Sequence, residues 1–257
     1  MAGKVNGGMA YGGMAKGGLA DALQAAKIVL LLGAGVLLSI HVVENPQDSM
    51  VARLVTYPKV WALLVQHLQI VVLSCLLAIG TAVPAGIFLT RPRFQKWAPH
   101  VLGLVNIGQS VPSLAVVALS VGLMGVGAQT AIIALWVYAL LPILSNTMTG
   151  IRQLDPAIVE AANGMGMHPL HILFRIELPL AFPLILSGIR TAVTINIGSA
   201  ILAAFVGGGG LGNLIIAGNN ISRWQVVILG AMLPVIMALV ADTGFDVFER
   251  HSRAARL

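Results

Sequence analysis

Charged side chains are scarce in this sequence of 257 residues. Asp, Glu, Lys and Arg make up 9% of it, against roughly 25% in soluble domains. Apolar residues make up 58%, and the mean hydropathy is +0.92. This composition excludes an ordinary soluble domain and indicates a chain that lies in a lipid bilayer. The alternation typical of transmembrane β-strands is also absent, so we expect the spanning elements to be helices.

Other absences narrow the chemistry. The single cysteine, Cys75, leaves no partner for a disulfide within the chain, and its apolar surroundings do not suggest a reactive thiol. No G-x-x-x-x-G-K-[ST] sequence occurs, so any ATP that drives this protein would have to bind another polypeptide. The run Gly207-x-Gly209-x-x-Gly212 matches a dinucleotide-binding pattern only formally, because it follows an apolar span and no βαβ unit surrounds it.

The six histidines indicate neither a metal site nor a catalytic set. His168 and His171 lie three residues apart, but no cysteine or plausible third ligand is near them, so we expect a solvated pair. The others lie in unrelated segments: His41, His67, His100 and His251. We therefore expect no catalytic residue, no metal and no cofactor in this chain.

Long apolar runs predict an all-α integral membrane protein with about six transmembrane helices, since roughly twenty apolar residues cross the hydrocarbon core as a helix. The expected spans are roughly 25–43, 66–89, 100–121, 128–148, 180–206 and 225–245. We expect residues 1–22, rich in glycine and alanine, to be a mobile tail, and residues 23–61 to be an uncleaved first helix with an external segment. Residues 62–250 would form the main transmembrane domain, followed by a basic tail, 251–257.

Lys and Arg are distributed unevenly over the connecting segments. If the N-terminus is cytoplasmic, the outer segments contain only Arg53, Lys59 and Arg223, while Arg190 lies within the fifth span. The remaining basic residues all lie on the inner side: Lys4, Lys16, Lys27, Arg91, Arg93, Lys96, Arg152, Arg175, Arg250, Arg253 and Arg256. This asymmetry follows the positive-inside rule and predicts cytoplasmic N- and C-termini. The net charge of +6 therefore indicates topology and contact with anionic lipid, not nucleic-acid binding.

A polar stretch, residues 150–180, separates the fourth and fifth spans and falls on the cytoplasmic side. Asp155, followed by proline, predicts a helix N-cap, and Gly166 predicts the turn that ends this first helix. His168, also followed by proline, predicts the start of a second helix. Two short helices joined by glycines would form a compact knob, which either fits a groove on a partner protein or is only a solvated connector.

This stretch contains a motif with fixed spacing: E-A-A, three residues, G, nine residues, I-x-L-P. It resembles the cytoplasmic coupling loop of the permease subunits of ATP-binding-cassette (ABC) importers, and every motif position is filled. The resemblance implies a type I ABC importer permease fold. It also implies that contact with an ATPase is made by Glu160, Ala161, Ala162, Gly166, Ile176, Leu178 and Pro179.

The resemblance extends over residues 62–250 and favours permeases of osmoprotectant importers, which take up glycine betaine, choline, carnitine and related quaternary amines. The run T-I-N-I-G-S at 194–199 most favours this subgroup. Permeases for methionine share the coupling loop and the glycine-rich turn, so a methionine or other amino-acid permease is the alternative. Only 5% of the residues are aromatic, and none cluster into a cation–π cage, so solute selectivity would belong mainly to a binding protein.

The resemblance also implies partners and a location. The partners would be a cytoplasmic ABC ATPase that binds the ATP, an external or periplasmic solute-binding protein, and a second permease subunit, identical or similar. The location would be the cytoplasmic (inner) membrane of a bacterium or archaeon. An ion-coupled secondary transporter that uses Arg190 and Asp242 is a less favoured reading, and a channel or assembly factor is a third.

Polar side chains within spans are costly and are therefore candidates for function. One helical face of the third span carries Asn106, Gln109, Ser110 and Ser113, with Pro112 able to kink the helix. One face of the fifth span carries Ser187, Arg190, Thr191 and Thr194. These two stripes either line a water-filled translocation pathway or only hold helices together.

Two further groups lie at the ends of spans. A glycine run at the outer end of the fifth span predicts a sharp turn, which is either an external gate or a flexible loop: Gly207, Gly208, Gly209, Gly210 and Gly212. The run resembles a glycine-rich segment at the same place in these permeases. Asp242 and Asp246, near the inner end of the last span, are expected to be interfacial charges.

Overall fold

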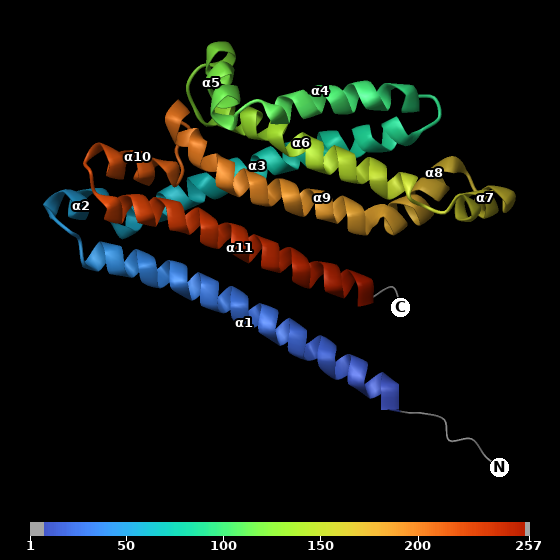
Figure 1. Cartoon of the computed structure of the whole chain (residues 1–257), viewed down its shortest axis with the longest axis horizontal. Coiled ribbons are helices and arrows are strands. Elements are labelled where there is room, and N and C mark those ends of the chain that lie inside the picture. The colour runs from blue at the N-terminus through green and yellow to red at the C-terminus, as the bar shows by residue number, and fades with distance from the viewer. Residues whose placement is uncertain (1–7, 255–257) are drawn as a thin grey trace.

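The computed structural model describes the backbone of residues 8–254 and the side chains of residues 22–250. Within this range the chain is helical apart from short connections (Figure 1). Its elements are α1 (Gly8–Glu44), α2 (Ser49–Leu54), α3 (Tyr57–Thr90), η1 (Gln95–Trp97), α4 (Ala98–Ser110), α5 (Ser113–Met124), α6 (Ala128–Arg152), α7 (Pro156–Gly164), α8 (Pro169–Ile172), the π-helical turn η2 (Leu173–Glu177), α9 (Leu178–Ser199), the 3₁₀ segment η3 (Ala200–Val206), α10 (Gly212–Asn220) and α11 (Trp224–Ala254).

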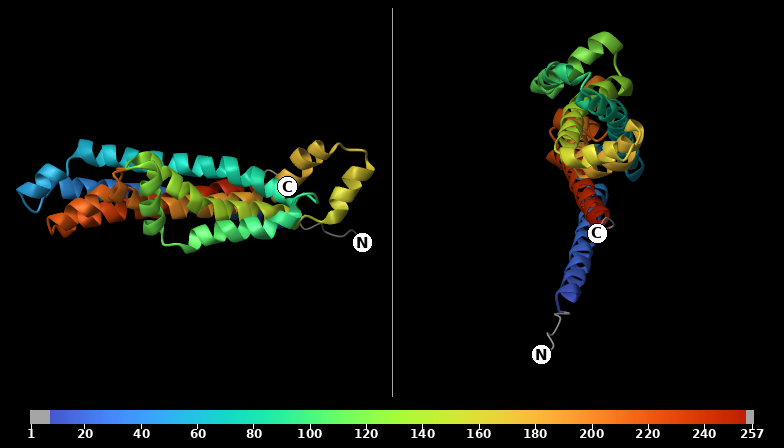
Figure 2. Two further views of the ribbon diagram at one scale, coloured as in Figure 1. Left: turned by 90° about the horizontal axis from the view of Figure 1, so that it is seen from above. Right: turned by 90° about the vertical axis from the view of Figure 1, so that its right-hand side faces the viewer.

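Within the part of the chain that the structure describes, five helical runs are long and apolar enough to cross a membrane: Ala22–Glu44, Tyr57–Thr90, Ala128–Arg152, Pro169–Val206 and Trp224–Arg250. They extend side by side along the long axis of the molecule (Figures 1 and 2). The short helices α2 and α10 lie at one end, and α7 and α8 lie at the other (Figure 1). α1 begins and α11 ends toward the α7–α8 end. The prediction of an all-α membrane protein is thereby confirmed.

The third predicted span is not a single helix. α4 and α5 form a pair bent by 100°, which brings the candidate spans to six if the pair counts as one. Proline disfavours a helical conformation in the residue before it, so α4 ends before Val111-Pro112. Tyr138 of α6 donates its hydroxyl to the carbonyl of Val111, and Gln109 Nε2 donates to the Tyr138 carbonyl at 3.0 Å. α6 thus supplies hydrogen bonds to the break, as a broken helix at membrane depth requires.

Two predicted boundaries also differ from the structure. α1 begins at Gly8, so residues 8–22, predicted as a mobile tail, are helical, and the Ala, Met, Leu and Lys residues between the glycines favour this. The rest of the predicted tails, residues 1–7 and 255–257, lies outside the described residues. The fifth span was expected to start at residue 180, but the helical run starts at Pro169 and continues through Pro179. The helix can continue because proline disrupts a helix least in its first turn, and Pro179 occupies the first turn of α9.

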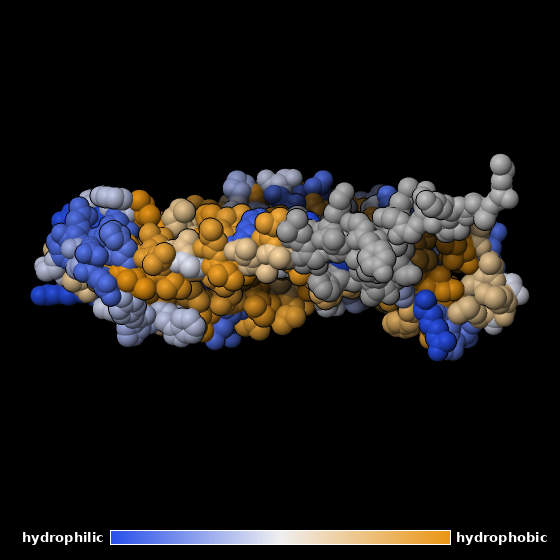
Figure 3. Space-filling view, turned by 90° about the horizontal axis from the view of Figure 1, so that it is seen from below, coloured by the Kyte–Doolittle hydropathy of each residue, from blue (hydrophilic) through white to orange (hydrophobic). Residues whose placement is uncertain are grey.

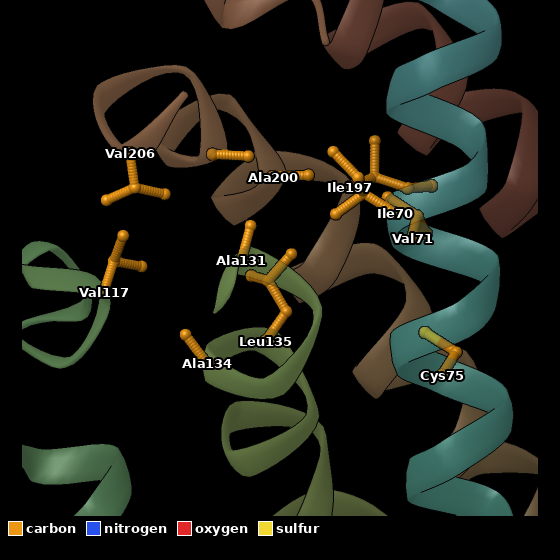
Figure 4. Packing of buried hydrophobic residues seen from close by; sticks show 11 residues of the cluster. Ile70, Val71, Cys75, Val117, Ala131, Ala134, Leu135, Ile197, Ala200 and Val206 are labelled. Carbon is orange, nitrogen blue, oxygen red and sulfur yellow. The ribbon is translucent and has the colours of Figure 1, made fainter. Parts of the chain in front are cut away.

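Small residues let the central helices approach closely. α6 packs against α3 on one side and α9 on another. A Cβ atom added to Gly188 of α9 would lie 2.7 Å from the Cβ of Asn146, and one added to Gly86 of α3 would lie 2.8 Å from the Cβ of Thr147. Both contacts are closer than side chains tolerate, so these crossings need glycine. Figure 4 shows a buried cluster between these helices, to which α3 contributes Ile70 and Cys75 and α6 contributes Leu135.

The surface is that of a membrane protein. Large apolar side chains are exposed along the spans, among them Leu30 of α1 and Leu104 of α4. Figure 3 shows apolar residues covering the middle of the visible face, with hydrophilic residues gathered at the end formed by α2 and α10. An apolar exterior of this kind is stable only against lipid or against another apolar surface.

Candidate functional site: a polar loop beyond the bundle and polar faces within it

The loop between α6 and α9 has the predicted caps. Asp155 Oδ1 accepts a hydrogen bond from the backbone N–H of Ala157 at 2.9 Å and caps α7. His168 Nδ1 accepts one from the N–H of Leu170 at 3.3 Å and caps α8, which gives this histidine a structural role. Gly166 has φ +77°, a left-handed conformation that glycine adopts without steric cost. The helix–turn–helix predicted from the sequence is confirmed.

The knob is less independent of the fifth span than predicted. Only α7 is a separate helix, because α8 continues through η2 directly into α9. Figure 1 shows α7 and α8 projecting beyond the end of the bundle. A displacement of α8 is therefore passed along a continuous helical run into α9.

The exposed surface of this knob combines a charge with apolar groups. Glu160 and Ala161 are exposed, whereas Ala162 is 1% exposed and packs inside the chain, so only one of the two alanines is free for close approach. Apolar side chains are exposed beside them: Ile158, Met165 and Leu170. Of the remaining motif residues, Ile176 and Leu178 are half-buried and Pro179 is exposed. Exposed apolar groups on a polar loop outside the spans are typical of a protein interface.

An ion pair that the sequence analysis missed ties the loop to α3. Both carboxylate oxygens of Glu177 accept hydrogen bonds from the guanidinium of Arg91, with Nη1 3.0 Å from Oε1. Glu177 is 6% exposed, and Arg91 supplies the opposite charge that a buried carboxylate needs to offset the cost of burial. The two residues are 86 positions apart, and no local pattern marks them as partners.

The predicted polar stripe of α9 divides into two parts. Ser187 and Thr191 are exposed and Thr194 is half-buried, and the threonine hydroxyls bond only to backbone carbonyls of their own helix. Arg190 instead turns to α11, where its guanidinium pairs with Asp242, with Nε 2.6 Å from Oδ1, and with Asp246. The sequence predicted that both aspartates are interfacial charges. The structure shows in addition that both are ion-pair partners of Arg190.

The predicted polar stripe of the third span is interrupted. Ser113 begins α5 beyond the bend, so it does not share a helical face with the three residues of α4. Asn106 and Ser110 are exposed, and Gln109 bonds to the Tyr138 carbonyl on α6. α4 and α9 both pack on α6 and are not in substantial contact with each other. Within a single copy of the chain, the polar residues of α4 and those of α9 therefore do not come together.

The glycine run makes the predicted sharp turn, and the turn is packed. Gly207, Gly209 and Gly210 have φ between +66° and +85°. The Gly210 N–H donates to Gln66 Oε1 of α3 at 3.2 Å, and a Cβ on Gly212 would lie 2.0 Å from the carbonyl oxygen of Ile201. The segment is therefore held against the N-terminal part of α3, which disagrees with a freely flexible loop.

A second set of contacts holds together the end of the molecule formed by α2 and α10. Asp48 caps α2 and also pairs with Arg223, with Nε 2.5 Å from Oδ2. The hydrogen bond from the backbone N–H of Val51, followed by that from Arg223, lowers the pKa of Asp48. Gln225 bonds to the backbone of both Asn45 and Gln47. The connection between α1 and α2 is thus tied to the start of α11.

Comparison with known proteins gives a consistent result. The chain is 44% identical over 185 residues to the choline transport system permease protein OpuBB of Bacillus subtilis (strain 168). The matched region covers 72% of this chain and 84% of that protein. It is 40% identical over 186 residues to the osmoprotectant import permease protein OsmY of Salmonella typhimurium, covering 72% and 79%.

The fold is also that of a solved structure, an inward-facing conformation of the MetNI methionine ABC transporter. The match has a TM-score of 0.69 at 24% identity, covering 77% of this chain and 99% of that chain. The architecture is therefore the type I ABC importer permease fold. Residues 82–254 match the family described as binding-protein-dependent transport system inner membrane component. The chain belongs to this family of permeases.

Proposed function

We propose that this chain is the membrane-spanning permease subunit of an ATP-driven importer and forms the pathway for a quaternary-amine osmoprotectant such as glycine betaine or choline. The observation that carries the proposal is the loop 150–180. It has a fixed-spacing motif, a left-handed turn at Gly166 and an exposed surface of Glu160, Ala161 and apolar side chains. The 40–44% identity to permeases named for choline and osmoprotectants supports the solute class.

ATP hydrolysis would take place on a separate subunit, and this chain would not be an enzyme. The sequence lacks a phosphate-binding loop, while its projecting knob offers a surface to a partner protein. The positive-inside distribution supports a cytoplasmic location for this knob and for both termini, with the chain in the inner membrane. In this mechanism the ATPase pulls on α7 and α8, and the continuous helical run carries the movement into α9.

Two further partners complete the importer. A second permease subunit is supported by the exposed polar faces of α4 and α9, which carry Asn106, Ser110, Ser187 and Thr191 and which one chain leaves apart. Polar faces of this kind are unfavourable against lipid and favourable along a water-filled pathway between subunits. An external solute-binding protein would deliver the solute to the end formed by α2 and α10, where the glycine turn closes against α3.

Reconstitution in proteoliposomes tests the proposal. The chain, its ATPase and its binding protein should together import radiolabelled choline or glycine betaine only when ATP is supplied on the ATPase side. Uptake of methionine in the same vesicles would correct the solute class. Uptake by the chain alone, driven by an ion gradient without the ATPase, would overturn the proposal in favour of a secondary transporter.

A further inference from the structure

Glu177 joins the cytoplasmic loop to a span other than its own through an ion pair with Arg91 of the α3 C-cap. It is the last residue of the π-helical turn η2 and directly precedes Leu178-Pro179. Its carboxylate is held by both Nη atoms of Arg91, the residue that caps the C-terminus of α3. A two-pronged bond to a planar guanidinium fixes orientation as well as distance.

The loop has few other attachments to the bundle. α7 packs chiefly on α8, and α8 packs on η2. A movement of the knob can therefore be transmitted to the spans in two main ways. The backbone connects η2 to α9, and the Arg91–Glu177 pair connects η2 to α3. A π-helical turn departs from regular α-helical hydrogen bonding, and such turns are often found at functional sites.

α3 extends from this ion pair to the opposite side of the molecule. Its 34 residues give a length of about 51 Å, enough to span the bilayer with turns to spare. Toward its outer end, Gln66 accepts the hydrogen bond from Gly210 in the glycine turn. The adjacent His67, which is fully buried, bonds through Nε2 to the Ile197 carbonyl of α9 at 3.0 Å. One helix thus joins the loop on one side to the glycine turn on the other.

We propose that Arg91 is a positioning residue for energy coupling. Through Glu177 it fixes the inner end of α3 to the loop, so that a movement of the loop shifts α3 together with α9 and displaces the glycine turn held by Gln66. This inference rests on the proposed function, since it requires an ATPase to move the loop. It adds a second transmission route that does not depend on the backbone connection into α9.

The test uses the full complex in proteoliposomes with radiolabelled choline and measures solute imported per ATP hydrolysed. The variants are Arg91→Gln, Glu177→Gln and the charge-swapped double variant Arg91→Glu/Glu177→Arg. Arg93→Gln is the matched control, because Arg93 lies two residues away and its guanidinium lies over the Phe94 ring, 5.7 Å from the centroid. Assembly with the ATPase and its hydrolysis rate are measured in parallel.

In the proposed arrangement, each neutral variant assembles and hydrolyses ATP, but imports at least about fivefold less choline per ATP. The charge-swapped variant recovers part of the loss, and Arg93→Gln behaves as wild type. Unchanged choline per ATP in both neutral variants overturns the inference. If the neutral variants do not assemble, the charge-swapped variant decides: assembly with coupled uptake supports the pairing, and failure of either overturns it. A wild-type complex without ATP-dependent uptake refutes the proposed function itself, which is a separate result.

Discussion

Arg190 of α9 and Asp242 of α11 form an ion pair within the spanning part of the chain, with Nε 2.6 Å from Oδ1, and Asp246 one turn further along binds the same guanidinium. Lys27 of α1 also attracts Asp242 electrostatically. Charges at this depth are retained only where they are compensated. The pair therefore holds the last span against α9, the helix that continues from the loop 150–180.

Removing the positive member of this cluster should destabilise the protein. Arg190→Gln leaves two carboxylates without their main partner, and we expect a loss of roughly 1–3 kcal/mol, less than for a fully buried pair because all three side chains are partly exposed. Arg190→Lys should lose less, since it keeps the charge but not the planar fork. Thermal unfolding in detergent measures both. Equal stability of Arg190→Gln and wild type would contradict the structural role.

Substitutions at Gly166 can test the effect of backbone conformation separately from the effect of side-chain size. A Cβ atom added there meets nothing within 4 Å, so the cost of a substitution in this chain comes from φ +77° and not from crowding. Asn tolerates this conformation and β-branched residues do not, so Gly166→Asn should keep most ATP-dependent uptake and Gly166→Val should lose it. Both variants should insert into the membrane normally. Normal uptake by Gly166→Val would show that the turn does not position the loop.

The exposed face of α9 should be accessible to water. In a variant series, Ser187→Cys and Thr191→Cys should react with a hydrophilic maleimide in the assembled complex. The native Cys75 is buried and should contribute no background. Leu76→Cys is the control, because Leu76 of α3 is 59% exposed but belongs to an apolar surface that lipid should shield. If Leu76→Cys reacts and the α9 variants do not, the assigned pathway is wrong.

Acid should weaken the contacts that Asp48 makes at the end of the molecule formed by α2 and α10. The pKa of Asp48 is lowered in the folded chain, so its ionised form stabilises the fold above the unfolded pKa of about 3.9, and this contribution is lost as pH falls through the lower folded value. Asp48→Asn keeps a good N-cap but loses the pairing with Arg223. Its thermal stability should be lower than wild type at pH 7, and the difference should narrow toward pH 3. A constant difference across this range would exclude the ion pair as its cause.

The parts of this structure that depend on neighbouring residues could be predicted from the sequence. The caps at Asp155 and His168 and the turn at Gly166 follow from short-range backbone chemistry, and all three are present. The spans follow from the length of apolar runs. Proline at 112 indicated a kink, but the 100° bend depends on hydrogen bonds from Tyr138 and Gln109, which the third span alone does not contain.

The ion pairs could not be predicted in the same way. Arg91 and Glu177 are 86 residues apart, and Arg190 and Asp242 are 52 apart, so their pairing depends on how three spans pack. Helical periodicity put Arg190 on one face with Ser187 and Thr194, which lie three residues before it and four residues after it. A long side chain at the edge of that face can turn either way, and the carboxylates of α11 decide its direction.

The most direct test of the central claim is site-specific crosslinking from the knob to the ATPase. Ala161→Cys, exposed on α7, should crosslink to the ATPase in assembled complexes and should react with a membrane-impermeant reagent only from the cytoplasmic side. Asn219→Cys, exposed on α10 at the opposite end, should react only from outside and form no such crosslink. Labelling of Ala161→Cys from outside, or its crosslinking to the solute-binding protein, would contradict the account.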